Sequence, residues 1–224
     1  MRKRTLVLVV VLVIFGVGLT VYRIFFLRMV RVPTSSMANT IFPGDHLLLS
    51  KTFGQIERGT LIVFQYDPKS PGYSDRYRED PATFYIARVV GLPGETIQTR
   101  GKTVYINERP LPEQKVTIRE VDLDDPLEEL STEGSGPYRV FYSSRSNEER
   151  AAFSEDEAFA GKTPFKIPND TYFVMGDNRD NSEDSRYRGP VPRELIWGKA
   201  VMIYYSESMK TGEARWDRVF KRIH

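Results

Sequence analysis

Cysteine is absent from the 224-residue sequence, and histidine occurs only twice, as His46 and His224. Zinc and iron–sulfur centres are built mainly from cysteine and histidine ligands. Neither kind of centre can be assembled here in the usual way, so we expect no metal and no cofactor. A Ser-His-Asp catalytic arrangement would have to use one of these two histidines, which argues against it.

A surplus of charge of one sign is also lacking. The chain has 32 lysine and arginine residues against 30 aspartate and glutamate residues, which gives a net charge of +2. Proteins that bind nucleic acids usually carry a clustered positive surplus, so we expect no nucleic-acid partner. The sequence has no internal repeat, no dinucleotide-binding glycine fingerprint and no Walker-type loop. A phosphate-binding function is therefore not indicated.

Alanine does not occur before Ala38, so the N-terminal region lacks the Ala-x-Ala exit of a cleavable signal peptide. An uncharged run of 18 residues extends from Thr5 to Tyr22 and follows three basic residues. A membrane-spanning helix needs about 18 or more such residues. We therefore predict that residues 1–28 form an N-terminal tip and an uncleaved transmembrane anchor. Arginines on both sides of the run leave its orientation open under the positive-inside rule.

Short runs rich in Val, Ile, Thr, Tyr and Phe follow the anchor, and glycine or proline separates them. Such runs are typical of β-strands, and Arg100-Gly101 is typical of a hairpin turn. The predicted fold class is mainly β: an antiparallel β domain with an inserted smaller subdomain and one N-terminal transmembrane helix. We assign the β core to residues 29–107 and 166–208. The predicted strands lie at 46–50, 60–65, 83–91, 96–99 and 103–107.

Composition shifts in residues 108–165, which contain an acidic patch at 122–129 and a charged run at 146–157. We interpret this segment as an inserted cap subdomain with solvated charged faces and no chemistry of its own. The C-terminal segment, residues 209–224, is basic and amphipathic. Its apolar side chains follow helical spacing, so it would either pack on the core as a helix or lie at anionic lipid headgroups. Those side chains are Trp216, Val219, Phe220 and Ile223.

The stretch from Gly176 to Pro190, which we call the signature loop, consists almost entirely of turn formers and charged residues. It is either a solvated surface loop or a support held rigid by ion pairs. This loop and three earlier segments resemble, in order and spacing, the motifs of bacterial type I signal peptidase (leader peptidase). Members of that family are membrane serine endopeptidases that use a Ser-Lys dyad. The earlier segments are Val32 to Asp45, Arg58 to Phe64 and Tyr85 to Glu95.

The resemblance implies a role for individual residues. Ser36 occupies the position of the nucleophile, and Thr34 with the Ser36 N–H would form the oxyanion hole. Ala87 occupies the position of the general-base lysine. The supporting residues implied are Ser182 beside that position, the ion pair of Asp184 with Arg186 and the ion pair of Asp177 with Arg88.

Alanine cannot act as a base, and a serine hydroxyl is a poor nucleophile unless a base takes its proton. Arg88 cannot replace the lysine, because a guanidinium keeps its proton in proteins. Lys51 and His46 are the other candidates, although each is expected to be an ordinary strand residue. The sequence thus leaves two hypotheses open: an enzyme with another base, and a binding protein. A third, a tethered structural β domain, does not explain four motifs in order.

The resemblance also implies the substrate and the location. A signal peptidase I removes signal peptides from exported preproteins after small residues, in the pattern Ala-x-Ala. The chain would then be inactive or would trap substrate; the alternative is a non-catalytic pseudo-peptidase that binds preproteins. The implied location is the bacterial inner membrane, single-pass, with the catalytic domain on the extracytoplasmic side, in contact with membrane lipid. The residues implied for the substrate pocket are Val32, Met37, Ile41, Tyr85 and Ile86.

Overall fold

The computed structural model describes residues 2–52, 54–66, 83–119, 128–144, 159–161 and 163–223. Most of the acidic patch predicted at 122–129 and all of the charged run predicted at 146–157 lie outside these residues, as does His224. The described chain is mainly β, as predicted, and most of its strand pairs are antiparallel.

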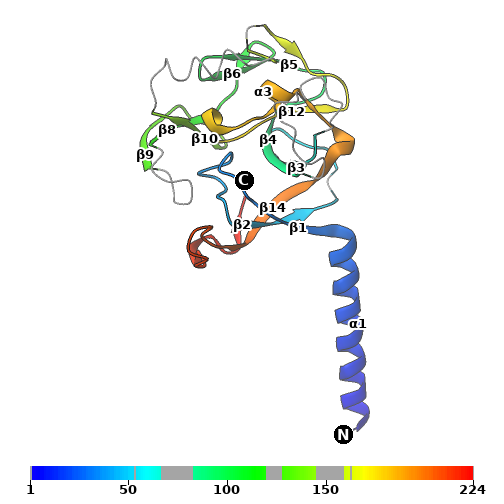
Figure 1. Cartoon of the computed structure of the whole chain (residues 1–224). Helices are drawn as coiled ribbons and strands as arrows, with labels where there is room; N and C mark the ends of the chain where they lie inside the picture. Colours follow the sequence, from blue (N-terminus) through cyan, green and yellow to red (C-terminus); the bar gives the residue numbers. More distant parts are fainter. Residues whose placement is uncertain are drawn as a thin grey trace.

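Helix α1 (Arg2–Phe26) opens the chain and projects away from the β domain (Figure 1). It spans the uncharged run on which the sequence prediction rested, and its side chains from Val7 to Phe15 are exposed. In the described residues, no helix meets the combined length and apolarity required for crossing a membrane.

The main sheet begins directly after α1 and has the strand order β1-β2-β14-β3-β4-β12-β13, with β15 paired to β14. The burial pattern of a strand depends on where it lies in the sheet: in some strands buried and half-buried residues alternate, and in others every residue is buried. In β2, Leu47 and Leu49 are buried while their neighbours are half-buried. In β3 all four residues are buried, because separate apolar clusters cover both faces of the sheet. The strands are β1 (Leu27–Arg31), β2 (Asp45–Ser50), β3 (Leu61–Phe64), β4 (Tyr85–Gly91), β12 (Thr171–Met175), β13 (Val191–Pro192), β14 (Ile196–Ser206) and β15 (Lys221–Arg222).

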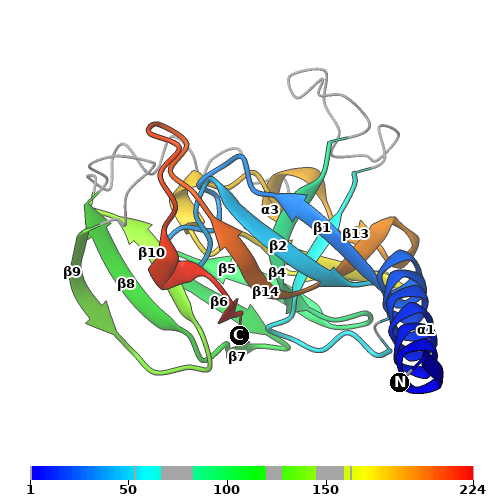
Figure 2. The same ribbon diagram turned by 90° about the horizontal axis from the view of Figure 1, so that it is seen from below.

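Two smaller sheets complete the β domain. The first has the order β11-β5-β6-β7 and contains the predicted hairpin, with Arg100 opposite Thr103. The second has the order β10-β8-β9, and its β10–β8 pair is parallel. This second sheet lies on the opposite side of the domain from α1 (Figure 2). The strands are β5 (Thr96–Arg100), β6 (Thr103–Ile106), β7 (Arg109–Pro110), β8 (Gln114–Arg119), β9 (Glu128–Glu133), β10 (Arg139–Ser143) and β11 (Phe165–Lys166).

The segment at 108–165, predicted to be an insertion, is divided between these sheets. Its first and last strands, β7 and β11, pair with β6 and β5. Its middle strands form the three-stranded sheet, and β10 runs against the signature loop, where Phe141 N donates to Asp177 O at 2.7 Å. The inserted segment therefore contacts the loop that carries most of the predicted supporting residues.

The helical prediction for the C-terminal segment is wrong. The structure has a short 3-10 helix, η4 (Trp216–Arg218), followed by β15, which pairs with β14. Trp216 and Phe220, assigned to the apolar face, are 75% and 70% exposed, whereas Arg218 is buried. The helical spacing of the apolar residues was misleading, because the segment buries an ion pair between Arg218 and Asp45 rather than an apolar stripe.

Candidate functional site

A cleft of about 780 Å³ brings together three segments that are far apart in the sequence. One wall is the segment that carries Ser36, another is the beginning of β4 with Ala87, and the third is the signature loop around Ser182. The remaining lining residues are Pro33, Thr34, Ser35, Phe64, Thr83, Phe84, Tyr85, Ile86, Asp180, Asn181, Glu183, Asp184, Tyr187 and Arg188.

The hydroxyl groups of Ser36 and Thr34 lie next to each other at the cleft, with 3.3 Å between the Ser36 Oγ and the Thr34 Oγ1. Ser36 is half-buried and Thr34 is exposed. The following turn is tight, because Ala38 N donates to Ser35 O at 3.0 Å and Ile41 N donates to Met37 O at 2.9 Å. Thr34 and Ser36 both line the cleft at the beginning of this turn.

Two asparagines of the signature loop fix the backbone around Ser36. Asn178 N donates to Ser36 O at 3.0 Å, and its side-chain amide donates to Ser35 O at 3.2 Å. The Asn181 amide donates to the Ser35 Oγ at 2.9 Å. Sequence reasoning gave these asparagines no role, because asparagine is equally common in any surface turn. Helix η2 (Arg179–Asn181) carries Asn181 to this position.

Ala87 is 3% exposed and lies opposite Ile62 in the β3–β4 pair. It packs in an apolar cluster with Ile62, Phe64 and Val89. Within the described part of the chain, no lysine or histidine lines the cleft. His46 instead faces Glu207, with 3.5 Å between its Nε2 and the Glu207 Oε1, and Lys51 follows the end of β2.

Arg88 and Asp177 form the ion pair that the resemblance implied. Two parallel hydrogen bonds join them, at 2.8 Å from Nε and 2.6 Å from Nη2, and both side chains are within 1% of complete burial. Arg88 also donates to Gly59 O, and Thr40 donates to Asp177. Burial alone would lower the pKa of Arg88, but the charge and hydrogen bonds of Asp177 outweigh it and leave that pKa raised. The pair joins β4 to the signature loop.

Asp184 and Arg186 form a second pair within the signature loop, with Nε–Oδ1 and Nη2–Oδ2 distances of 2.8 Å each. Asp184 also caps the short helix α3 (Ser185–Arg188) and accepts a hydrogen bond from Gly176 N at 2.9 Å. Arg186 in turn donates to Arg179 O at 2.7 Å. Hydrogen bonds and an ion pair within the loop therefore hold it together, which the alternative of a solvated surface loop does not require.

A third buried pair links the inserted segment to the signature loop, and no sequence pattern indicated it. Arg179 donates to Glu113, Tyr138 donates to Glu113 at 3.2 Å, and Arg179 and Glu113 are 1% and 3% exposed. Burial would lower the pKa of Arg179, but the Glu113 carboxylate outweighs it and leaves that pKa raised. In the sequence, Glu113 cannot be told apart from a solvated glutamate. Spacing along the chain does not show which of the many carboxylates will pair with Arg179.

The five residues implied for the substrate pocket are not all on the cleft wall. Tyr85 and Ile86 line the cleft. Val32, Met37 and Ile41 lie below it, at most 2% exposed, in the core cluster against which Ile86 packs. Arg188, which had no predicted role, lines the cleft, donates to the Tyr85 hydroxyl at 3.0 Å and pairs with Glu183 at 2.9 Å.

One end of the cleft is connected to the chain that leaves α1. Phe84 lines the cleft and packs on Trp197, with 3.9 Å between their ring centroids. The guanidinium of Arg28, in β1, lies 3.8 Å over the same indole ring. The Phe84 end of the cleft is therefore the end nearest α1.

Gly176 lies where Ser182 and the Ser36 segment meet. A methyl group at this position would lie 2.2 Å from the Ser182 Oγ and 2.6 Å from the Ser36 carbonyl oxygen. We expect Gly176→Ala to lower the free energy of unfolding by about 1–3 kcal/mol, because one of these segments must move. Urea denaturation measures the effect. Gly54→Ala is the matched control, since nothing lies within 4 Å of a methyl group there. Equal midpoints for the two variants would contradict this packing.

The family description "Signal peptidase, peptidase S26" matches residues 2–205, which include every segment that lines the cleft. The chain belongs to the signal peptidase family. Signal peptidase I of Aquifex aeolicus is 32% identical over 211 residues, covering 78% of this chain and 74% of that protein. Signal peptidase I of Pseudomonas fluorescens is 32% identical over 213 residues, covering 83% and 67%. A crystal structure of a signal peptidase I from Enterococcus faecalis is 24% identical, covers 66% of this chain and 98% of that one, and has a TM-score of 0.37.

Membership in the signal peptidase family places the chain among serine endopeptidases. The region that matches the family ends at residue 205, so η4 and β15 lie beyond it.

Proposed function

We propose that the cleft binds the end of a signal peptide on an exported preprotein, with Ser36 at the scissile bond, and that the chain holds this substrate without cutting it efficiently. The observation that carries the proposal is the composition of the cleft. It combines the Ser36 and Thr34 hydroxyls, 3.3 Å apart, with a buried alanine at position 87. No lysine or histidine of the described chain reaches it.

In this proposal Ser36 Oγ attacks the scissile carbonyl carbon. The Thr34 hydroxyl and the Ser36 N–H donate to the carbonyl oxygen as it becomes negative, and each such donor is worth about 3 to 4 kcal/mol in serine hydrolases. Asn178, which donates to the Ser35 and Ser36 carbonyl oxygens, and Asn181, which donates to the Ser35 hydroxyl, support the placement of these donors. The pairs Arg88–Asp177 and Asp184–Arg186 hold the signature loop, which carries the two asparagines. In the same loop, Ser182 would orient an amine at position 87.

Among the described residues that line the cleft, there is no amine or imidazole that could take the Ser36 proton. Arg188 is the basic side chain of the wall, and a guanidinium keeps its proton. Three carboxylates also line the cleft, but each already accepts hydrogen bonds. Asp184 accepts from Gly176 and Arg186, Asp180 from Ser143 N, and Glu183 from Arg188. The Ser36 hydroxyl therefore stays protonated and reacts slowly.

The edge of β4 supports binding of an extended peptide. Strand β3 pairs with β4 from Tyr85 to Arg88, whereas β12 pairs with it only from Arg88 to Gly91. In the described chain the edge at Ile86 and Ala87 that faces the cleft is thus not covered by β12. An extended signal peptide can add there as a strand. The half-buried side chains of Tyr85 and Ile86 narrow the cleft beside this edge. The narrowed space favours small side chains on the substrate, in the pattern Ala-x-Ala.

We further propose that α1 is the single-pass membrane anchor, with the β domain on the extracytoplasmic side of the bacterial inner membrane. Its uncharged run of 18 residues and the exposed apolar side chains from Val7 to Phe15 support contact with lipid. The contact from Arg28 through Trp197 to Phe84 sets the cleft close to the anchor. A substrate held at the membrane by its own apolar segment would meet the cleft at this end.

The second candidate function is a non-catalytic pseudo-peptidase that binds preproteins, and the buried Ala87 favours it over an enzyme with another base. Lys51 and His46, the bases considered from sequence, are not among the residues that line the cleft. The two candidates share the binding step and differ only in whether a bound preprotein is ever cleaved.

Selectivity for small residues is the first expected result. A fluorescent peptide that carries Ala-x-Ala should bind the detergent-solubilised chain at least about tenfold more tightly than the same peptide with tryptophan in place of both alanines. The reason is that a tryptophan side chain cannot enter the part of the cleft narrowed by Tyr85 and Ile86 without displacing these residues. Fluorescence anisotropy measures both affinities. Equal binding of the two peptides would contradict the proposed specificity.

A further inference from the structure

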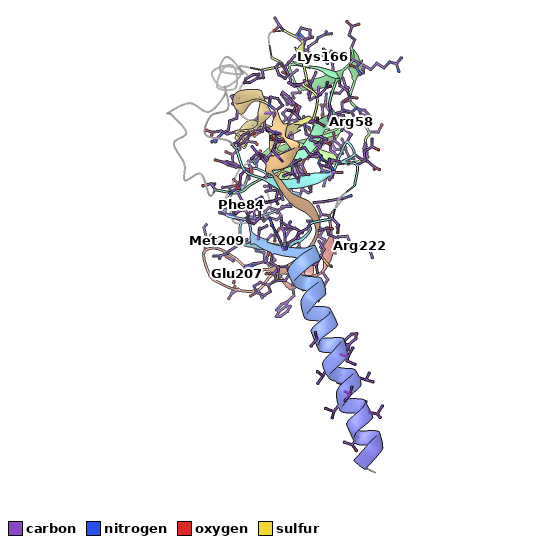
Figure 3. All side chains as sticks on the ribbon, turned by 90° about the vertical axis from the view of Figure 1, so that its right-hand side faces the viewer. Arg58, Phe84, Lys166, Glu207, Met209 and Arg222 are labelled. Atoms are coloured by element: carbon purple, nitrogen blue, oxygen red, sulfur yellow. The ribbon has the colours of Figure 1, made fainter. Side chains whose placement is uncertain are left out.

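The last part of the described chain, residues 207–222, folds back against the turn that follows Ser36. We call it the C-terminal strap. Figure 3 shows Glu207, Met209 and Arg222 of the strap at the end of the β domain from which α1 emerges. The strap lies beyond residue 205, where the match to the signal peptidase family ends. Nothing in the proposed function accounts for it.

Arg218 is the centre of the contact between the strap and the turn. Its Nε donates to the Asp45 Oδ1 at 3.0 Å, and its Nη2 donates to the Asp45 Oδ2 at 2.6 Å and to Thr40 O at 3.2 Å. Its guanidinium carbon also lies 4.4 Å over the Phe42 ring. The Asp45 Oδ2 accepts a further hydrogen bond from Phe42 N at 2.8 Å. One buried side chain of the strap thus holds Thr40, Phe42 and Asp45.

Two more contacts join the strap to the same turn. Arg215 Nη2 donates to Pro43 O and to Glu207 O, at 2.7 Å each, and Glu207 N donates to Gly44 O at 3.1 Å. The backbones approach so closely that a methyl group at Gly44, whose φ is +84°, would lie 2.0 Å from Glu207 O. The strap therefore contacts the turn at Glu207, Arg215 and Arg218 and does not rest on a single ion pair.

The turn transmits this contact to Ser36. Thr40 N and Ile41 N both donate to Met37 O, at 2.8 and 2.9 Å, and Met37 follows Ser36 directly. On the opposite side, the Thr40 hydroxyl donates to Asp177 at 2.6 Å. Thr40 is thus held by the signature loop through its side chain and by the strap through its carbonyl oxygen.

We propose that the C-terminal strap positions the nucleophile, and that Arg218 is the positioning residue that acts through Thr40 and the turn. This inference rests on the proposed role of Ser36. A displacement of about 1 Å in a reacting group can cost about 100-fold in rate. Without the strap, the turn would be held only by the signature loop, and the resulting displacement of Ser36 would lower the turnover rate. A strap that merely secured the end of the chain would affect stability and leave turnover unchanged.

The test uses the full chain with Ala87→Lys as the background, and adds Arg218→Met together with Asp45→Asn. The double change removes the pair without leaving a buried charge uncompensated. We expect kcat for a preprotein with an Ala-x-Ala site to fall by about 100-fold, with KM within threefold. Trp216→Ala is the control, because this neighbour is 75% exposed and should leave kcat unchanged. An unchanged kcat in the Arg218→Met/Asp45→Asn variant would overturn the proposal.

Amide hydrogen exchange in the chain with Ala87 in place separates this proposal from the proposed function. We expect the Thr40 and Ile41 amides to exchange at least about tenfold faster in the Arg218→Met/Asp45→Asn variant, and to be unaffected by Trp216→Ala. If Ala87→Lys shows no activity, the proposed role of Ser36 as nucleophile fails and the exchange rates alone decide on the strap. Unchanged protection of the two amides would overturn it. If the double variant does not fold, Arg218→Lys, which keeps the charge but loses the two parallel bonds, is judged by the same two measurements.

Discussion

Replacing Ala87 with lysine is expected to raise the rate of preprotein cleavage by up to about 10⁶-fold, which corresponds to about 8 kcal/mol of transition-state stabilisation. The position suits a lysine base. Ala87 is buried among Ile62, Phe64 and Val89, and burial of an amine in apolar surroundings lowers its pKa and favours the neutral form that can accept a proton. Ser182 lines the same cleft and can orient the amine.

The measurement is single-turnover cleavage of a preprotein with an Ala-x-Ala site. Ala87→Lys combined with Ser36→Ala is the control, and it should abolish the gain in rate, leaving at most the residual catalysis that the oxyanion hole and substrate binding supply. Ala87→Met, which has a similar length and no amine, separates the effect of the base from the effect of filling the space. Equal rates for Ala87→Met and Ala87→Lys would rule out the lysine as the missing base.

Asp177→Ala is expected to lower the free energy of unfolding by about 3 to 5 kcal/mol, because it leaves Arg88 buried and uncompensated. Arg88 is 1% exposed and donates two hydrogen bonds to Asp177. An exposed pair should behave differently. Arg119 and Glu128 are 60% and 52% exposed, so Glu128→Ala should cost at most about 1 kcal/mol.

Urea denaturation of both variants tests this difference. Asp177→Asn provides a further comparison, because it keeps the shape of the side chain and removes only the charge. It should lie between the parent chain and Asp177→Ala. A loss of stability from Asp177→Ala no greater than that from Glu128→Ala would show that the signature loop does not depend on this ion pair.

The strands of the main sheet could be predicted because local sequence patterns indicate them, whereas the residues at the cleft were implied by the resemblance to the signal peptidase family. The strand runs, the Arg100-Gly101 hairpin and the cluster of charges in the signature loop each have a local pattern. The buried pairs Arg179–Glu113 and Arg218–Asp45 have none. Each joins residues that are far apart in the chain, and the charge of an arginine does not indicate which carboxylate it will meet.

The wrong helical prediction at the C-terminus has the same origin. The apolar residues at the C-terminus do follow helical spacing. Trp216 and Phe220 are nevertheless exposed, because Arg218 is the side chain that is buried, where it pairs with Asp45. Val32, Met37 and Ile41, which the resemblance implied for the substrate pocket, are buried in the core cluster against which Ile86 packs, and their part in the pocket stays a prediction. A resemblance between motifs says which residues are near the site, whereas packing decides which of them reach the surface of the cleft.

The most direct test of the central claim is intact-mass analysis of a preprotein with an Ala-x-Ala site after incubation with the chain in detergent, followed by separation of bound and free material. We expect the preprotein to be recovered bound and intact, and Ala87→Lys to convert it to mature protein and signal peptide under the same conditions. Release of mature protein by the chain with Ala87, at a rate equal to that of Ala87→Lys, would show that the alanine does not disable cleavage.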